Sequence, residues 1–239
     1  MRIIIMVFFL SLLTNIKAQT RGYALDTVID LNGDKLKENI SVKIFHSDTS
    51  DFIFTVNGRS ITGVLEMRNQ NISGFKIVDL NKNDKYKEIA VYSSGPSSDD
   101  DYHFYGYDSS VFFMNHIFES LTFSGNGIVY GEDWKGFWIA HDKYILNNET
   151  RKLEHIKQFA YYVGTTVKTI GEFEIYREKE LINKVALVSK DSEITLLLCD
   201  NKDIEFYDML YLVKTKTQLL GWAKFREIYD NIVPLDMAD

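Results

Sequence analysis

The chain has 239 residues, of which 45% are hydrophobic and 14% are aromatic, and it contains only two prolines. Its formal net charge of −7 argues against nucleic acid as a ligand and against attachment to anionic membrane surfaces. The single cysteine, Cys199, excludes an internal disulfide, so packing of the core, with or without bound metal, has to hold the fold together.

Residues 1–18 have the pattern of a secretory signal peptide. Arg2 supplies a short positive region, residues 3–13 form an almost continuous apolar run, and Ala18 is the small residue before the expected cleavage point. The run is too short for a membrane span, and no later stretch reaches the ~18 apolar residues that a span needs. We therefore expect a cleaved leader, a mature chain that is secreted or periplasmic, and no membrane insertion after cleavage.

Residues 19–165 predict a β-rich repeat domain. Short runs of aromatic and β-branched residues alternate with polar turns at intervals of roughly 8–12 residues. The dipeptide Asn57-Gly58 lies between two such runs and predicts a tight hairpin turn. No sustained helical period occurs before about residue 170. The fold class is therefore mainly β, and we expect an irregular or truncated propeller-like or sandwich arrangement in this domain.

Two acidic loops of nearly the same sequence lie in this domain. Their candidate metal ligands are Asp30, Asn32, Asp34 and Glu38 in the first loop and Asp79, Asn81, Asn83, Asp84 and Glu88 in the second. Alternating oxygen-bearing side chains followed by a carboxylate are typical of a short loop that binds Ca²⁺. The same residues can instead cap an Asx-rich turn without metal. The doubling indicates a repeated β-unit, with a third, degenerate copy near residues 123–127.

The loops resemble the calcium-binding loops of the FG-GAP/VCBS repeat superfamily, which includes integrin-type propeller domains. In that family, oxygens at loop positions one, three, five and nine hold the ion, and the first loop matches all four positions. The second loop has one extra residue. Either Asp84 replaces Asn83 through a one-residue bulge, or Glu88 reaches from one residue further on. The resemblance implies weak, structural Ca²⁺ sites, and we expect no other cofactor.

Residues 172–230 predict a small barrel of short strands, after a boundary near residues 164–171. The segment 211–224, which ends in Gly221-Trp222-Ala223-Lys224, resembles the closing strands of a bacterial SH3-type domain. Such domains bind extended peptides on aromatic side chains, which assigns Tyr207, Tyr211 and Trp222 to a ligand groove. The alternative is that Trp222 only fills the barrel. The resemblance implies a cell-wall or envelope peptide or protein as the partner.

The other chemistry-bearing residues form no catalytic motif. Residues 97–103 contain three adjacent aspartates and His103, but neighbours on a strand point to opposite faces, so we interpret the segment as a solvated loop. The five histidines form no His-x-His or His-x-x-x-His pair, which argues against zinc. Cys199 follows an apolar strand and is interpreted as a buried small hydrophobe.

These patterns together predict a secreted, non-enzymatic binding or scaffold protein of the cell envelope. In this interpretation the SH3-type domain recognises a peptide or wall component, and Ca²⁺ stabilises the N-terminal β domain. The alternative from a different class is an envelope hydrolase with an acidic cleft around Asp100 and Asp101 and an SH3-type targeting domain.

Overall fold

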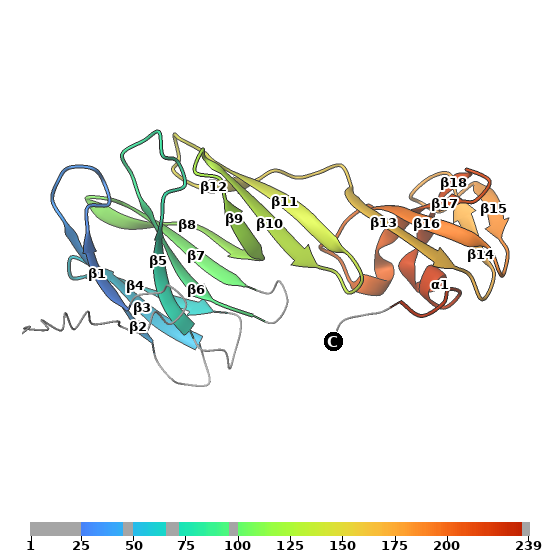
Figure 1. Ribbon diagram of the computed structural model, residues 1–239, viewed down its shortest axis with the longest axis horizontal. Helices are drawn as coiled ribbons and strands as arrows, with labels where there is room; N and C mark the ends of the chain where they lie inside the picture. The colour runs from blue at the N-terminus through green and yellow to red at the C-terminus, as the bar shows by residue number, and fades with distance from the viewer. Residues whose placement is uncertain (1–24, 45–49, 66–71, 96–99, 236–239) are drawn as a thin grey trace, which may run out of the picture.

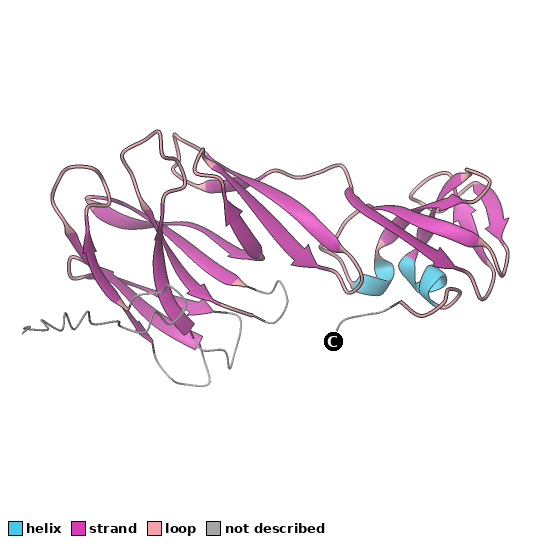
Figure 2. Ribbon diagram, in the orientation of Figure 1, coloured by secondary structure: helices cyan, strands magenta, loops and turns pink. Residues whose placement is uncertain are grey.

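The computed structural model describes residues 25–44, 50–65, 72–95 and 100–235. The prediction of a mainly β chain is confirmed, because 57% of the described residues lie in strands and 4% in helices (Figure 2). The strands form four antiparallel sheets, none of which closes into a barrel. The predicted leader lies outside the described residues. Among the helices of the described part, none is long and apolar enough to cross a membrane.

The first three sheets each contain four strands that neighbour one another in sequence order (Figure 1). The first sheet contains β1 (Asp26–Ile29), β2 (Glu38–Ile44), β3 (Ser50–Val56) and β4 (Arg59–Leu65). The second contains β5 (Ile72–Val78), β6 (Glu88–Ser93), β7 (Asp101–Asp108) and β8 (Ser110–Phe118). The third contains β9 (Ser120–Phe123), β10 (Ile128–Trp134), β11 (Ile139–Leu146) and β12 (Leu153–His155).

The turn predicted at Asn57-Gly58 is confirmed. Both residues have positive φ, 48° and 78°, and Val56 pairs with Arg59 across the turn. A two-residue hairpin of this kind requires positive φ at both central positions, which Asn and Gly adopt at low cost. The local sequence therefore fixes the connection between β3 and β4.

The first three sheets pack against one another through two hydrophobic cores. One core, which includes Phe52, Phe54 and Tyr105, lies between the first and second sheets. The other, which includes Phe104 and Val129, lies between the second and third sheets. Because successive residues of a strand point to opposite faces, neighbours on β7 enter different cores. The second sheet is thus covered on both faces, and all six residues of β6 are buried.

The fourth sheet contains the remaining strands, in the order β13-β16-β17-β18-β14-β15. Its elements are β13 (Tyr161–Lys168), β14 (Phe173–Tyr176), β15 (Lys184–Val188), β16 (Glu193–Cys199), the 3₁₀ turn η1 (Phe206–Asp208), β17 (Leu210–Thr215), β18 (Leu220–Lys224) and the short helix α1 (Phe225–Tyr229). The sheet thus begins at Tyr161, inside the range that the sequence assigned to the N-terminal domain.

The third and fourth sheets share a core. Trp138, before β11, donates a buried hydrogen bond from Nε1 to the Tyr211 hydroxyl of β17 at 3.0 Å. Phe137 stacks on Phe225 of α1, with ring centroids 5.4 Å apart. Cys199 is fully buried in the same core, and this burial raises the pKa of its thiol to about 11. The interpretation of Cys199 as a buried hydrophobe agrees with this position, since a thiolate is disfavoured there.

Candidate functional site

Each acidic loop connects the first and second strands of its sheet, and a glutamate side chain at the start of the second strand hydrogen-bonds to the backbone of the loop. Glu38 and Glu88 begin β2 and β6, and both are buried. Glu38 accepts a hydrogen bond from the Leu31 backbone N–H at 2.8 Å, and Glu88 accepts one from the Leu80 N–H at 3.1 Å. The glutamates thus hold the loop backbone in equivalent ways, although one residue more separates Glu88 from its partner.

The extra residue of the second loop lies before Asp84. The Asp34 carboxylate accepts a hydrogen bond from the backbone N–H two residues on, at 2.7 Å, and the Asp84 carboxylate does the same at 2.8 Å. Glu38 and Glu88 then follow at the same distance in sequence. Of the two alternatives, Asp84 therefore takes the place of Asp34, and the extra residue lies between Asn81 and Asp84.

The side chains of the first loop are largely used to cap its own turns. The Asp30 carboxylate accepts hydrogen bonds from the Gly33 and Lys35 N–H groups at 2.7 and 2.9 Å. Desolvation is the largest single contribution and opposes ionisation, but the backbone hydrogen bonds together outweigh it and lower the pKa of Asp30. In the second loop, by contrast, Oδ1 of Asp79 is buried and accepts no hydrogen bond. Asn32 and Asn81 each accept a bond from the backbone N–H two residues on.

The loops also join one sheet to the next. The Leu31 carbonyl accepts a hydrogen bond from Lys87 of the second loop at 2.8 Å, and the Leu80 carbonyl accepts one from Gly127 at 2.7 Å. Arg151 reaches from the third sheet to Glu88 at 3.0 Å. Burial raises the pKa of Glu88 in spite of this partner. The acidic loops therefore lie where neighbouring sheets meet.

The three aromatic residues assigned to a ligand groove do not lie together on one exposed surface. Tyr211 is fully buried in the core shared with the third sheet. Tyr207 is 44% exposed, and its ring stacks on the ring of Phe225. Trp222 is 8% exposed, with the ammonium group of Lys179 lying 5.0 Å from its ring centre.

A groove of about 730 Å³ lies elsewhere in the fourth sheet. Its walls come from the ends of β13 and β15 and from the turns at residues 189–193 and 215–219. Strands β13 and β15 are the two edges of the open sheet. The groove therefore occupies the gap between these edges, with exposed Leu187 and Leu219 beside charged side chains.

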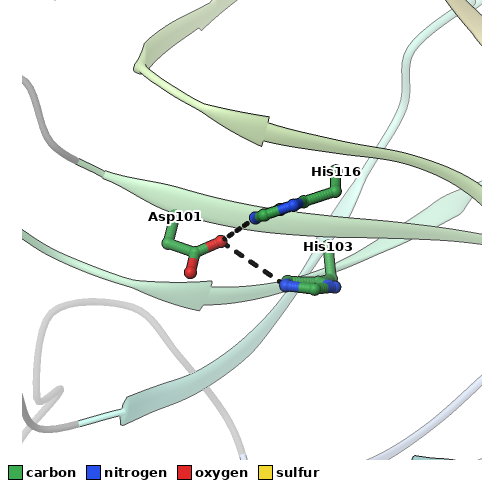
Figure 3. A group of neighbouring side chains, drawn as sticks. All are labelled: Asp101, His103 and His116. Carbon is green, nitrogen blue, oxygen red and sulfur yellow. Dashed lines mark hydrogen bonds and ion pairs between the residues drawn. The ribbon is translucent and has the colours of Figure 1, made fainter. Parts of the chain in front are cut away.

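Asp101, His103 and His116 form a cluster that the sequence interpretation missed (Figure 3). Asp101 and His103 are two residues apart on β7, so they share a face, and His116 of β8 pairs directly with His103. Asp101 Oδ1 lies 2.8 Å from His116 Nε2 and 3.5 Å from His103 Nε2. The imidazole rings stack with centroids 4.2 Å apart. Asp101 is fully buried rather than part of a solvated loop.

The surroundings of His103 hold its ring neutral and fixed in position. The ring packs edge-on against Phe52 at 5.4 Å, and it hydrogen-bonds to the backbone of Val64. Burial, reinforced by repulsion from His116, lowers the pKa of His103 to about 4. The spacing Asp-x-His on a predicted strand is the one sequence signal that could have identified this face in advance.

A second polar cluster joins the third and fourth sheets. Lys202, in the loop after β16, is 5% exposed. Its ammonium group lies 2.9 Å from Glu119, 2.7 Å from Asp133 and 2.8 Å from Asp142. Burial alone would lower the pKa of Lys202, but the carboxylates outweigh it and raise the pKa. Lys202 is therefore a permanently charged link between the two sheets.

Two buried carboxyl groups of this cluster have pKa values that are shifted in opposite directions. Burial raises the pKa of Glu119 to about 7, and the neighbouring Asp142 carboxylate adds to this rise. Burial also opposes ionisation of Asp142, but hydrogen bonds from Lys202 and His155 prevail and lower its pKa. Glu119 is therefore the group of the two that binds a proton first as the pH falls. A Cβ at Gly131 would collide with the Glu119 carboxylate, so any larger residue there would displace this carboxylate.

Comparisons of the chain with protein-family models, with curated proteins and with solved structures find no match. The resemblances to FG-GAP/VCBS loops and to SH3-type domains therefore stay predictions.

Proposed function

We propose that the protein is a secreted, non-enzymatic binding or scaffold protein of the cell envelope whose SH3-type C-terminal domain binds an extended peptide. The observation that carries this proposal is the groove between the two edge strands of the fourth sheet. It replaces the surface around Tyr207, Tyr211 and Trp222 as the ligand site, because Tyr211 is buried in the shared core.

The geometry of β15 supports an extended peptide as the occupant. This strand pairs with β14 on one side only, so its other edge offers backbone N–H and C=O groups beside the groove. An edge strand can add a further strand through these groups, while side-chain pockets select the sequence. Leu187 is 50% exposed in the groove wall, and Lys216 and Glu193 place both charge signs nearby. These features suit a peptide that alternates apolar and polar residues.

A library of capped ten-residue peptides, screened by fluorescence anisotropy against the purified full-length chain, tests this proposal. The tightest peptide should shift the amide resonances of residues 186–188, and Leu187→Glu should weaken its binding by tenfold or more. Ile182→Glu is the matched control, since Ile182 is 63% exposed and lies outside the groove. Binding to none of the peptides, or equal affinity in the two variants, would contradict the proposal. Retention on purified peptidoglycan without peptide binding would instead indicate a wall glycan.

We also propose that Ca²⁺ stabilises the N-terminal β domain. The buried, unpartnered oxygen of Asp79 supports an ion at the second loop in particular. Since a ligand of the folded state alone stabilises it by mass action, millimolar Ca²⁺ should raise the melting temperature. The double change Asp30→Ala/Asp79→Ala should abolish the rise. An equal rise in wild type and variant would exclude these loops as the sites.

A further inference from the structure

Three donor atoms from β7 and β8 lie close together on the face of the second sheet that packs against the first sheet (Figure 3). The ring nitrogens of His103 and His116 and an oxygen of Asp101 all lie within 4.8 Å of one another. Metal–ligand bonds of about 2.0–2.2 Å in a tetrahedral site separate neighbouring donors by roughly 3.3–3.6 Å. The observed separation of 3.5 Å lies within that range and that of 2.8 Å lies below it, so a small side-chain movement that separates Asp101 from His116 would admit an ion.

The Nε2 atom of His103 is the strongest sign of a ligand. It is buried and has no hydrogen-bond partner, although it faces the Asp101 carboxylate. Because the other side of the ring donates to the backbone of Val64, Nε2 directs a lone pair toward a carboxylate oxygen. Two facing lone pairs repel each other, whereas a cation between them binds both. A histidine fixed by a backbone carbonyl through its second nitrogen is the usual arrangement of a metal ligand.

A second buried atom on the same face is also available to a ligand. Ser93 of β6 pairs in register with Asp101, so both side chains point into the same core. The Ser93 hydroxyl oxygen is buried and has no hydrogen-bond partner. An irregularity in the β7–β8 pairing lies next to the cluster, between Phe104 and Tyr105. Such bulges often re-aim side chains beside binding sites.

We infer that Asp101, His103 and His116 bind one divalent transition-metal ion. Two imidazole nitrogens and one carboxylate oxygen suit Zn²⁺ and its first-row neighbours, whereas Ca²⁺ prefers ligands that are all oxygens. Three protein ligands leave one coordination position for water or another small ligand, as in reactive rather than purely structural zinc sites. The His116 side chain is 28% exposed, so the cluster can be reached from solvent. The site is independent of the peptide groove, which belongs to the fourth sheet.

Zinc titration of the full-length chain after treatment with EDTA tests the inference. Calorimetry should show one equivalent of Zn²⁺, and Co²⁺ should give visible absorption bands of a site with nitrogen ligands. Both His116→Gln and His103→Phe should lower the affinity by tenfold or more. Histidine ring ¹⁵N spectra of the wild type, which need no variant, should show Zn²⁺ shifting the Nε2 signals of His103 and His116.

The chain offers a closely matched control in His155, whose Nε2 lies 2.7 Å from Asp142. Both histidine side chains are 28% exposed and both aspartates are fully buried, but no second imidazole lies beside His155 among the described residues. His155→Gln should therefore bind Zn²⁺ like the wild type. The inference is overturned if the wild type binds no Zn²⁺, if His116→Gln and His155→Gln have equal affinity, or if Zn²⁺ shifts only other histidines.

Discussion

Two buried Asp–His pairs lie on corresponding hairpins of neighbouring sheets, and they differ in their third partner. Asp101 and His116 are 2.8 Å apart on β7 and β8, and Asp142 and His155 are 2.7 Å apart on β11 and β12. Beside Asp142 the chain places the ammonium group of Lys202, whereas beside Asp101 it places the uncharged ring of His103. The same local geometry therefore serves an internal ion pair in one sheet and a ligand set in the other.

The difference shows what a buried aspartate requires. Burial of a carboxylate costs several kcal/mol, which only hydrogen bonds and a nearby cation can offset. At Asp142 the cation is part of the chain and also ties the fourth sheet to the third. At Asp101 we propose that it is a metal ion. The first cluster thus holds its cation within the folded chain, and in our proposal the second takes a cation from solution.

The largest expected effect comes from removing the cation of the Lys202 cluster. In Lys202→Met three acidic side chains, those of Glu119, Asp133 and Asp142, lose a partner at 2.7–2.9 Å. Breaking a buried pair in this way costs about 3–5 kcal/mol of unfolding free energy, which urea denaturation would measure.

The control for that change is Lys224→Met. Lys224 lies 3.7 Å from Asp208, and both side chains are about half exposed, so a loss below about 1 kcal/mol is expected. Equal losses in the two variants would show that the Lys202 cluster contributes no more than a surface pair. The argument that a buried aspartate needs a nearby cation, which we apply to both Asp142 and Asp101, would then fail.

The sequence predicted the strands better than either cluster, for a physical reason. Alternating apolar residues and the Asn57-Gly58 turn are local signals, and they led to the prediction of a mainly β chain, which the structure confirms. Regular pairing from the turn between Asp108 and Ser110 would place Asn115 opposite His103. The irregularity after Phe104 shifts the register by one residue and brings His116 there instead. A one-residue shift of this kind leaves no clear trace in a single sequence.

The Lys202 cluster could not be predicted from the sequence, because its members are far apart in the chain. Its acidic partners come from β10, β11 and the residue before β9, between 60 and 83 positions earlier in the chain. Only the packing of the fourth sheet against the third brings them to Lys202. The acidic loops are the converse case, because their partners lie within eight residues, and the position of the extra residue was one of two alternatives derived from sequence.

The next effect is a pH dependence confined to the Lys202 cluster. The pKa of Glu119 is raised to about 7 from 4.5, so the folded state keeps a proton that the unfolded chain releases. This contribution to stability is fully present below about pH 4.5 and is lost as the pH rises to about 7. It amounts to roughly 3 kcal/mol.

Glu119→Gln has no carboxyl proton to lose, so its unfolding free energy should not show this part of the decline with rising pH. Urea denaturation of wild type and variant at a series of pH values between 4.5 and 7.5 measures the difference in slope. Glu132→Gln, at an exposed position of β10, should leave the slope unchanged. A variant at Glu119 with the wild-type slope would show that the pKa of Glu119 is not raised in the folded protein.

The smallest expected effect is that of His103→Phe in the metal-free protein. The change removes a buried nitrogen without a partner and keeps a ring among Phe52 and Phe113. It also gives up the hydrogen bond to Val64, so the two contributions nearly cancel and the stability should change by less than about 1 kcal/mol. His155→Phe breaks a short bond to a buried carboxylate and should cost about 1–3 kcal/mol. Urea denaturation in EDTA compares the two. If His103→Phe were the more damaging change without metal, His103 would be a structural partner of Asp101, and the contrast between the two pairs would disappear.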